Sequence, residues 1–131
     1  MSDCPAVGHV AVTVKDLSVS RPWYRELIGA DPVLDEDTDG GFHHTVFNLS
    51  GTLLGLHEHP TTDTADTFTE LRMGLDHLAF ACPDRVALEG WQTRLDELGI
   101  GHGGIVDAHY GSGLSFRDPD GIALEFFAPP A

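Results

Sequence analysis

The sequence predicts an α+β protein built from two modules, each with the order strand, helix and then further strands (βαβββ). The stretch "VGHVAVTV" near the start is nearly repeated as "GLDHLAFAC" from Gly74. A helical pattern and then alternating strand patterns follow each copy. A polar, Thr-rich linker at about residues 60–74 separates the copies. We therefore expect a single domain over residues 1–131, with module 1 at about 5–60 and module 2 at about 74–129.

In module 1, the alternation of "HVAVTV" is typical of a strand. The next stretch, "DLSVSRPWYRELIG", indicates a helix that begins at Asp16 or Ser18, tolerates Pro22 in its first turn and ends at Gly29. After a "DTDGG" turn, "FHHTVFNL" and "TLLGLHE" are typical of two strands joined by a tight "SG" turn.

Module 2 follows the same order. "LDHLAFAC" predicts a strand, and "PDRVALEGWQTRLDELG" predicts a helix that ends at Gly99. Four side chains of that helix are spaced to share one face: Val86, Trp91, Leu95 and Leu98. A strand near residues 105–110 precedes the strand "LSFR". The turn "DPDG" and the strand "IALEFFA" close the module.

Composition excludes several classes of partner. The chain has 7 Lys and Arg against 21 Asp and Glu, a formal net charge of −14. That charge repels phosphate backbones and anionic lipid headgroups, so we expect neither a nucleic-acid nor a membrane partner. There is no apolar run of the roughly 18 to 20 residues that a membrane span needs. The N-terminus does not resemble a signal peptide, and the two cysteines form no pairing motif, so we expect a cytoplasmic protein.

Strand alternation places two histidines among small side chains. His9 shares a face with Ala11 and Thr13, whereas bulky valines take the opposite face. His77 likewise shares a face with alanines, opposite larger apolar residues. The surfaces that carry both histidines therefore leave room for a cavity.

Two further polar residues lie on the corresponding face of a last strand. His57 follows His9 by 48 residues, and Glu125 follows His77 by the same 48. Because a buried lone carboxylate is costly, Glu125 requires a partner or an ion, unless it faces solvent from an open sheet. His9, His57, His77 and Glu125 are therefore candidate ligands of a divalent metal, for which Zn, Fe(II), Mn, Ni and Co all suit the donors.

The position of His57 is less regular than that of the other three. Glu125 is four residues after the turn glycine Gly121, whereas His57 is six after Gly51. The difference is even, so the face is kept while the depth changes. Without His57, the other three still form a two-histidine, one-carboxylate group with open coordination positions. We expect the remaining histidines of the strands and loops to be structural or exposed: His43, His44, His59 and His102.

Three segments resemble the vicinal oxygen chelate superfamily, which contains glyoxalase I, extradiol dioxygenases, fosfomycin-resistance transferases and bleomycin-resistance proteins. They are "GHVAVTVKDLSVSRPWYRELIGA", "GLDHLAFACPD" and "FRDPDGIALEFFAP", the last being the most specific. The resemblance implies two βαβββ modules that curl into a cupped mixed sheet. It also implies metal ligands on the first and last strands of each module, at His9, His77, Glu125 and, less closely matched, His57.

The resemblance implies a metal-dependent enzyme in which the ion chelates two adjacent oxygens of a small substrate and acts as a Lewis acid. A histidine stands where glyoxalase I has a second glutamate, so glyoxalase-like lyase or isomerase chemistry and dioxygenase-type chemistry are both open, as is thiol transfer. We expect catalytic roles for Glu125, Tyr110 and His109. We expect Phe47, Tyr110 and Phe127 to line the substrate pocket.

One alternative comes from a different functional class. A metal-free binding protein of the bleomycin-resistance type would sequester a drug or metabolite, and the net charge of −14 would suit a cationic ligand. We also expect a homodimer, because superfamily members of this size complete their cups by pairing modules within or between chains.

Overall fold

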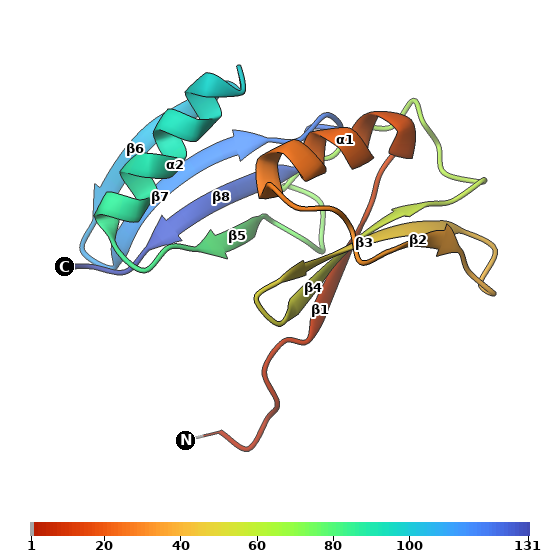
Figure 1. Cartoon of the computed structure of the whole chain (residues 1–131), viewed down its shortest axis with the longest axis horizontal. Helices are drawn as coiled ribbons and strands as arrows, with labels where there is room; N and C mark the ends of the chain where they lie inside the picture. The colour runs from red at the N-terminus through yellow and green to blue at the C-terminus, as the bar shows by residue number, and fades with distance from the viewer. Residues whose placement is uncertain (1) are drawn as a thin grey trace. The chain divides into compact units, whose positions relative to one another are not determined.

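The computed structural model describes residues 2–131, and the chain divides into two compact units. Unit 1 ends at Ala65, and unit 2 is Asp66–Ala131. Each unit has one four-stranded mixed sheet and one helix (Figure 1). This confirms the predicted α+β class with two βαβββ modules.

Unit 1 runs through five elements: β1 (His9–Thr13), α1 (Leu17–Ile28), β2 (Leu34–Asp37), β3 (His43–Leu49) and β4 (Thr52–Glu58). The strand order in its sheet is β1-β4-β3-β2. The first and last strands, β1 and β4, pair in parallel, and the other pairs are antiparallel.

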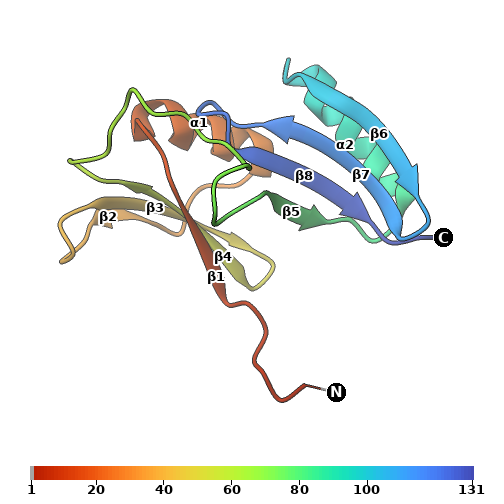
Figure 2. The same cartoon turned by 180° about the vertical axis from the view of Figure 1, so that it is seen from behind.

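Unit 2 repeats this order with β5 (Leu78–Ala81), α2 (Arg85–Glu97), β6 (His102–Ala108), β7 (Gly111–Arg117) and β8 (Ala123–Ala128). Its sheet has the order β5-β8-β7-β6, with β5 and β8 parallel. Helix α2 covers one face of this sheet and contacts β6, β7 and β8 (Figures 1 and 2). Neither α1 nor α2, the helices of the described residues, is long and apolar enough to cross a membrane.

Strand alternation decides which side chains form the two cores. Val12 and Val14 of the first module are 5% and 1% exposed, while Ala11 and Thr13, which alternate with them, are exposed. On the last strand of unit 2, Phe126 is 4% exposed and stacks on the Trp91 ring of α2 at 4.2 Å between centroids. Each sheet thus has one face packed on apolar residues, as the alternation predicts.

The structure differs from the sequence predictions at three places. β2 has no counterpart among the predicted strands, because all four of its residues are exposed and show no apolar alternation. Pro22 lies well inside α1, past the first turn, and the helix continues to Ile28. In α2, Val86 is 74% exposed, and Leu88 is the buried residue of that turn.

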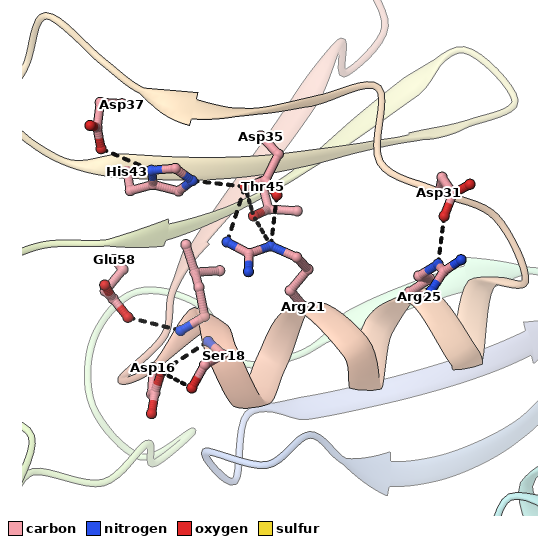
Figure 3. Close-up of polar contacts among 11 residues, drawn as sticks. Asp16, Ser18, Arg21, Arg25, Asp31, Asp35, Asp37, His43, Thr45 and Glu58 are labelled. Carbon is pink, nitrogen blue, oxygen red and sulfur yellow. Dashed lines mark hydrogen bonds and ion pairs between the residues drawn. The ribbon is translucent and has the colours of Figure 1, made fainter.

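The start of α1 is fixed by two carboxylates (Figure 3). Asp16 is the N-cap, and its side chain accepts a hydrogen bond from the Ser18 backbone N–H at 2.9 Å. Glu58, at the end of β4, accepts one from the Leu17 N–H at 2.8 Å. Strand parity predicts that Glu58 faces away from the His57 side, and its bond to the helix agrees with that.

A charged network holds the exposed edge strand β2 to β3 and α1 (Figure 3). His43 of β3 contacts Asp35 through Nε2 at 2.7 Å and Asp37 through Nδ1 at 2.9 Å. Asp35 also accepts a hydrogen bond from Thr45 and pairs with Arg21 of α1 at 2.8 Å. The network supplies the attachment that β2 lacks in apolar contacts.

Hydrogen bonds shift the pKa values of His43 and Asp35 in this network. The hydrogen bonds to Asp35 and then to Asp37 raise the pKa of His43 above its usual 6.5. Partial burial acts to raise the pKa of Asp35, but hydrogen bonds from His43 and Thr45 and the charge of Arg21 outweigh it and lower that pKa. The charged forms of both partners are therefore favoured in the folded protein.

We predict that replacing His43 by Gln destabilises the protein more at pH 6 than at pH 9. The folded-state pKa of His43 lies above its unfolded value, so its contribution is fully present below the unfolded pKa and is lost as pH rises through the folded pKa. Thermal unfolding midpoints of both proteins across this range measure the effect. Two curves with a constant separation would contradict the assignment.

Candidate functional site

Unit 2 brings His77 and Glu125 together at its parallel strand pair. Ala79 of β5 pairs with Glu125 of β8, so His77, two residues before Ala79, lies diagonally opposite the glutamate. The His77 Nε2 atom is 3.7 Å from Glu125 Oε1. The two side chains are 46% and 22% exposed. An imidazole and a carboxylate thus face each other on an accessible side of the sheet.

The other ring nitrogen of His77 is held by its neighbour in the chain. Nδ1 lies 2.7 Å from Asp76 Oδ1. A carboxylate accepts hydrogen bonds, so an N–H at Nδ1 would donate to Asp76, and Nε2 is the ring nitrogen on the side of Glu125. Metal-binding histidines typically donate their second N–H to a carboxylate in this way. The donors of this pair therefore fit a divalent metal ion.

His9 and His57 share the corresponding strand pair of unit 1 but not the same level. His9 pairs with Leu53 and Thr13 with His57, so the two histidines are four residues apart along the strands. At about 3.3 Å per residue, their Cα atoms are offset by about 13 Å along the strands. The His57 ring, however, reaches back over Gly55. The two residues lie on one face of the sheet, as predicted. His9 begins β1, and His57 of β4 lies opposite Thr13, which ends β1.

The register shows that the equal spacings of 48 residues do not mark equivalent positions. In unit 2, the residue two after His77 pairs with Glu125. In unit 1, the residue two after His9, Ala11, pairs with Gly55. Gly55 therefore holds the place in unit 1 that Glu125 holds in unit 2. His57 lies two residues further along β4 than Gly55, which matches the two-residue slip in the sequence.

His57 lies in an aromatic cluster at the end of β4. Its ring stacks on Phe42 at 4.4 Å, and His44 and His59 each lie 6.0 Å away between centroids. Burial lowers the pKa of His57, and the neighbouring imidazoles of His44, His59 and His9 lower it further. His57 is therefore favoured as a neutral ring. Within residues 2–131, no three His, Cys, Asp or Glu side chains are arranged to bind a metal ion.

The predicted pocket residues have different environments. Phe47 is 0% exposed and lies in the core of unit 1, so it cannot line a pocket on the face that carries His57. This prediction is wrong because Phe47 pairs with the core residue Leu54, so both side chains point into the core and away from the His57 face. Tyr110 is 66% exposed and stacks on Phe127 at 6.3 Å, with His109 edge-on to it at 5.2 Å.

These aromatic residues belong to the face that carries Glu125. Phe127 is two residues after Glu125 on β8 and shares its side of the sheet. Tyr110 extends that surface from the turn after β6. Tyr110, His109 and Phe127 thus form a mixed aromatic and proton-donating edge beside the pair of His77 and Glu125.

Sequence reasoning missed three residues that shape the candidate site. Asp76 directly precedes His77, and this adjacency could have indicated a carboxylate that orients the ring. Gly55, which pairs with Ala11, and Gly113, where a Cβ would meet the Glu125 side chain, carry no local signal, because their places beside candidate ligands depend on which strands pair. Their positions become apparent only from the register.

Comparisons with known proteins agree with this architecture. Residues 6–126 match the Glyoxalase/Bleomycin resistance protein/Dioxygenase superfamily. The metallothiol transferase FosB of Staphylococcus haemolyticus (strain JCSC1435) is 28% identical over 121 residues, covering 91% of this chain and 80% of the relative. The metallothiol transferase FosB of Shouchella clausii is 30% identical over 124 residues, covering 91% and 77%.

A solved structure shows the same fold. A glyoxylase/bleomycin resistance protein/dioxygenase domain from Frankia sp. EAN1pec superposes with a TM-score of 0.83 at 34% identity, covering 98% of this chain and 94% of the other. The match spans both units, as does the match to the superfamily. The chain belongs to the glyoxalase/bleomycin resistance protein/dioxygenase superfamily.

Proposed function

We propose that this chain is a metal-dependent enzyme whose divalent ion is bound by His9, His77 and Glu125. One observation carries the proposal. Within unit 2, His77 Nε2 and Glu125 Oε1 face each other at 3.7 Å, while Asp76 fixes the other nitrogen of the ring. His9 is the residue of unit 1 that corresponds to His77, since each lies two residues before an alanine that pairs with the last strand.

His57 is outside the proposed ligand set. The residue in the register position of Glu125 is Gly55, which has no donor atom of its own. The His57 ring lies over this glycine, with Nε2 3.2 Å from where a Gly55 Cβ would stand. A set of three ligands leaves coordination positions open for a substrate. His57 then belongs to the aromatic cluster with Phe42 and contributes no ligand.

A bound divalent ion would supply Lewis-acid chemistry to a substrate with two adjacent oxygens. The protein's own residues supply the rest. Asp76 keeps the His77 ring in one tautomer, and Glu125 contributes negative charge. Phe127 and Tyr110 offer an apolar surface, and the Tyr110 hydroxyl and the His109 ring offer proton-transfer groups at its edge.

Thiol transfer is the reaction class that the relatives favour, since both FosB proteins are named metallothiol transferases. Lyase or isomerase chemistry and dioxygenase chemistry are the alternatives, because the superfamily's name includes both glyoxalases and dioxygenases. The donor set of two histidines and one carboxylate suits each class.

A metal-free binding protein is the second candidate function. The formal net charge of −14 favours a cationic ligand, which the exposed carboxylates would attract. In that case divalent metals would not stabilise the folded protein, whereas a cationic drug or metabolite would.

We predict that the wild-type protein binds Zn²⁺ and that His77→Ala and Glu125→Ala each weaken binding at least about tenfold, because each removes a ligand. His57→Ala is the matched control and should bind within about threefold of wild type. Isothermal titration of protein freed of metal with a chelator measures all four. The proposal fails if wild type does not bind, and the ligand assignment fails if His57→Ala loses binding as Glu125→Ala does.

The reaction class is tested by supplying metal-loaded protein with a low-molecular-weight thiol and a panel of small electrophiles with adjacent oxygens. Transferase activity predicts that free thiol disappears, and that Glu125→Ala abolishes the loss. Oxygen uptake without thiol loss would instead indicate a dioxygenase. Isomerised product with thiol conserved would indicate the lyase or isomerase class.

We also propose that the protein is a homodimer. Superfamily membership supports this, since a cup can be completed by modules of one chain or of two. Sedimentation equilibrium should give twice the mass of the 14.1 kDa chain. A single species at the mass of one chain, across micromolar concentrations, would rule the dimer out.

A further inference from the structure

Gly113 of β7 lies directly beneath the carboxylate of Glu125. A Cβ atom at Gly113 would come within 2.7 Å of Glu125 Oε2 and 3.2 Å of its Cδ. The three atoms nearest to that Cβ position all belong to the Glu125 side chain. Such separations are well below van der Waals contact, so the glutamate occupies the space that any larger residue at position 113 would need.

The strand register explains this approach. Glu125 pairs with Ser115, and Gly113 pairs with Phe127, so Gly113 is the diagonal neighbour of Glu125 on β7. The glutamate side chain therefore leans across β7 instead of standing upright on β8. One carboxylate oxygen, Oε1, faces His77, which directly precedes β5, and the other, Oε2, lies over Gly113 on β7. The orientation of the carboxylate thus depends on the neighbours on both sides of β8.

Backbone conformation does not account for glycine at this position. Gly111, two residues earlier, has a φ of 145°, which favours glycine. The φ of Gly113 lies outside the left-handed region, so an alanine could adopt the same backbone. The requirement at position 113 is therefore space for the Glu125 side chain.

We propose that Gly113 is a positioning residue for Glu125: the missing side chain sets where the carboxylate lies relative to His77. The inference rests on the proposed function, because the carboxylate must be placed in order to bind the metal. An alanine at position 113 would collide with the far end of a flexible side chain, which can move without disturbing the strands. The substitution should therefore displace the ligand and leave the fold intact.

The test compares Gly113→Ala with Gly103→Ala in the same sheet. At Gly103 a Cβ would come no closer than 3.9 Å to another atom, the Ser115 carbonyl oxygen. We expect Gly113→Ala to weaken Zn²⁺ affinity about tenfold to a hundredfold, as loss of an orienting contact does. The visible spectrum of the Co²⁺-loaded protein should change as well. Gly103→Ala should keep the wild-type affinity and spectrum, and both metal-free variants should unfold at the same temperature.

A second pair of variants separates positioning from a general loss of stability. Glu125→Asp withdraws the carboxylate by one methylene and relieves the collision. Gly113→Ala should therefore cost less Zn²⁺ affinity in the Glu125→Asp background than in wild type. Equal costs in both backgrounds, an unchanged affinity and spectrum in Gly113→Ala, or its failure to fold would each overturn the inference. Absence of Zn²⁺ binding in wild type would instead refute the proposed function.

Discussion

The parallel pairing between the first and last strands of each unit determines the rest of this structure. β4 hydrogen-bonds to β1, and β8 hydrogen-bonds to β5, with the helix and the other strands of the unit forming the long connection that a parallel pair requires. Residues more than 40 positions apart in the chain thereby become neighbours on one face. The opposite face packs on apolar residues, which leaves the face of His9 or His77 available for polar chemistry.

The register of these parallel pairs makes the two units unequal. Glu125 lies diagonally beside His77, whereas the corresponding neighbour of His9 is Gly55. Unit 2 therefore places a carboxylate beside its imidazole, whereas in unit 1 the corresponding residue is Gly55 and the His57 ring lies over it. A duplicated fold thus supports an asymmetric donor set, which suits a metal that must keep coordination positions for a substrate.

Alternation along strands could be read from the sequence, because it depends only on neighbouring residues. It predicted the burial of Val12 and Phe126 and the accessible faces of His9 and His77. Register could not be read, because it depends on pairing between distant segments. That is why the spacing of 48 residues suggested an equivalence for His57 that the strands do not have. Phe47 was misplaced for the same reason, since its side of the sheet follows from its pairing with Leu54.

The glycines of the two sheets connect the fold to the proposed chemistry. Gly55 and Gly113 each leave space on the face that carries candidate ligands: the His57 Nε2 atom lies over Gly55, and the Glu125 carboxylate lies over Gly113. The metal that we propose is bound by two imidazoles and one carboxylate. X-ray absorption of the zinc-loaded protein counts these ligands directly. We expect two histidine nitrogen ligands with oxygen donors in the remaining positions, and three histidine ligands would contradict the proposed ligand set.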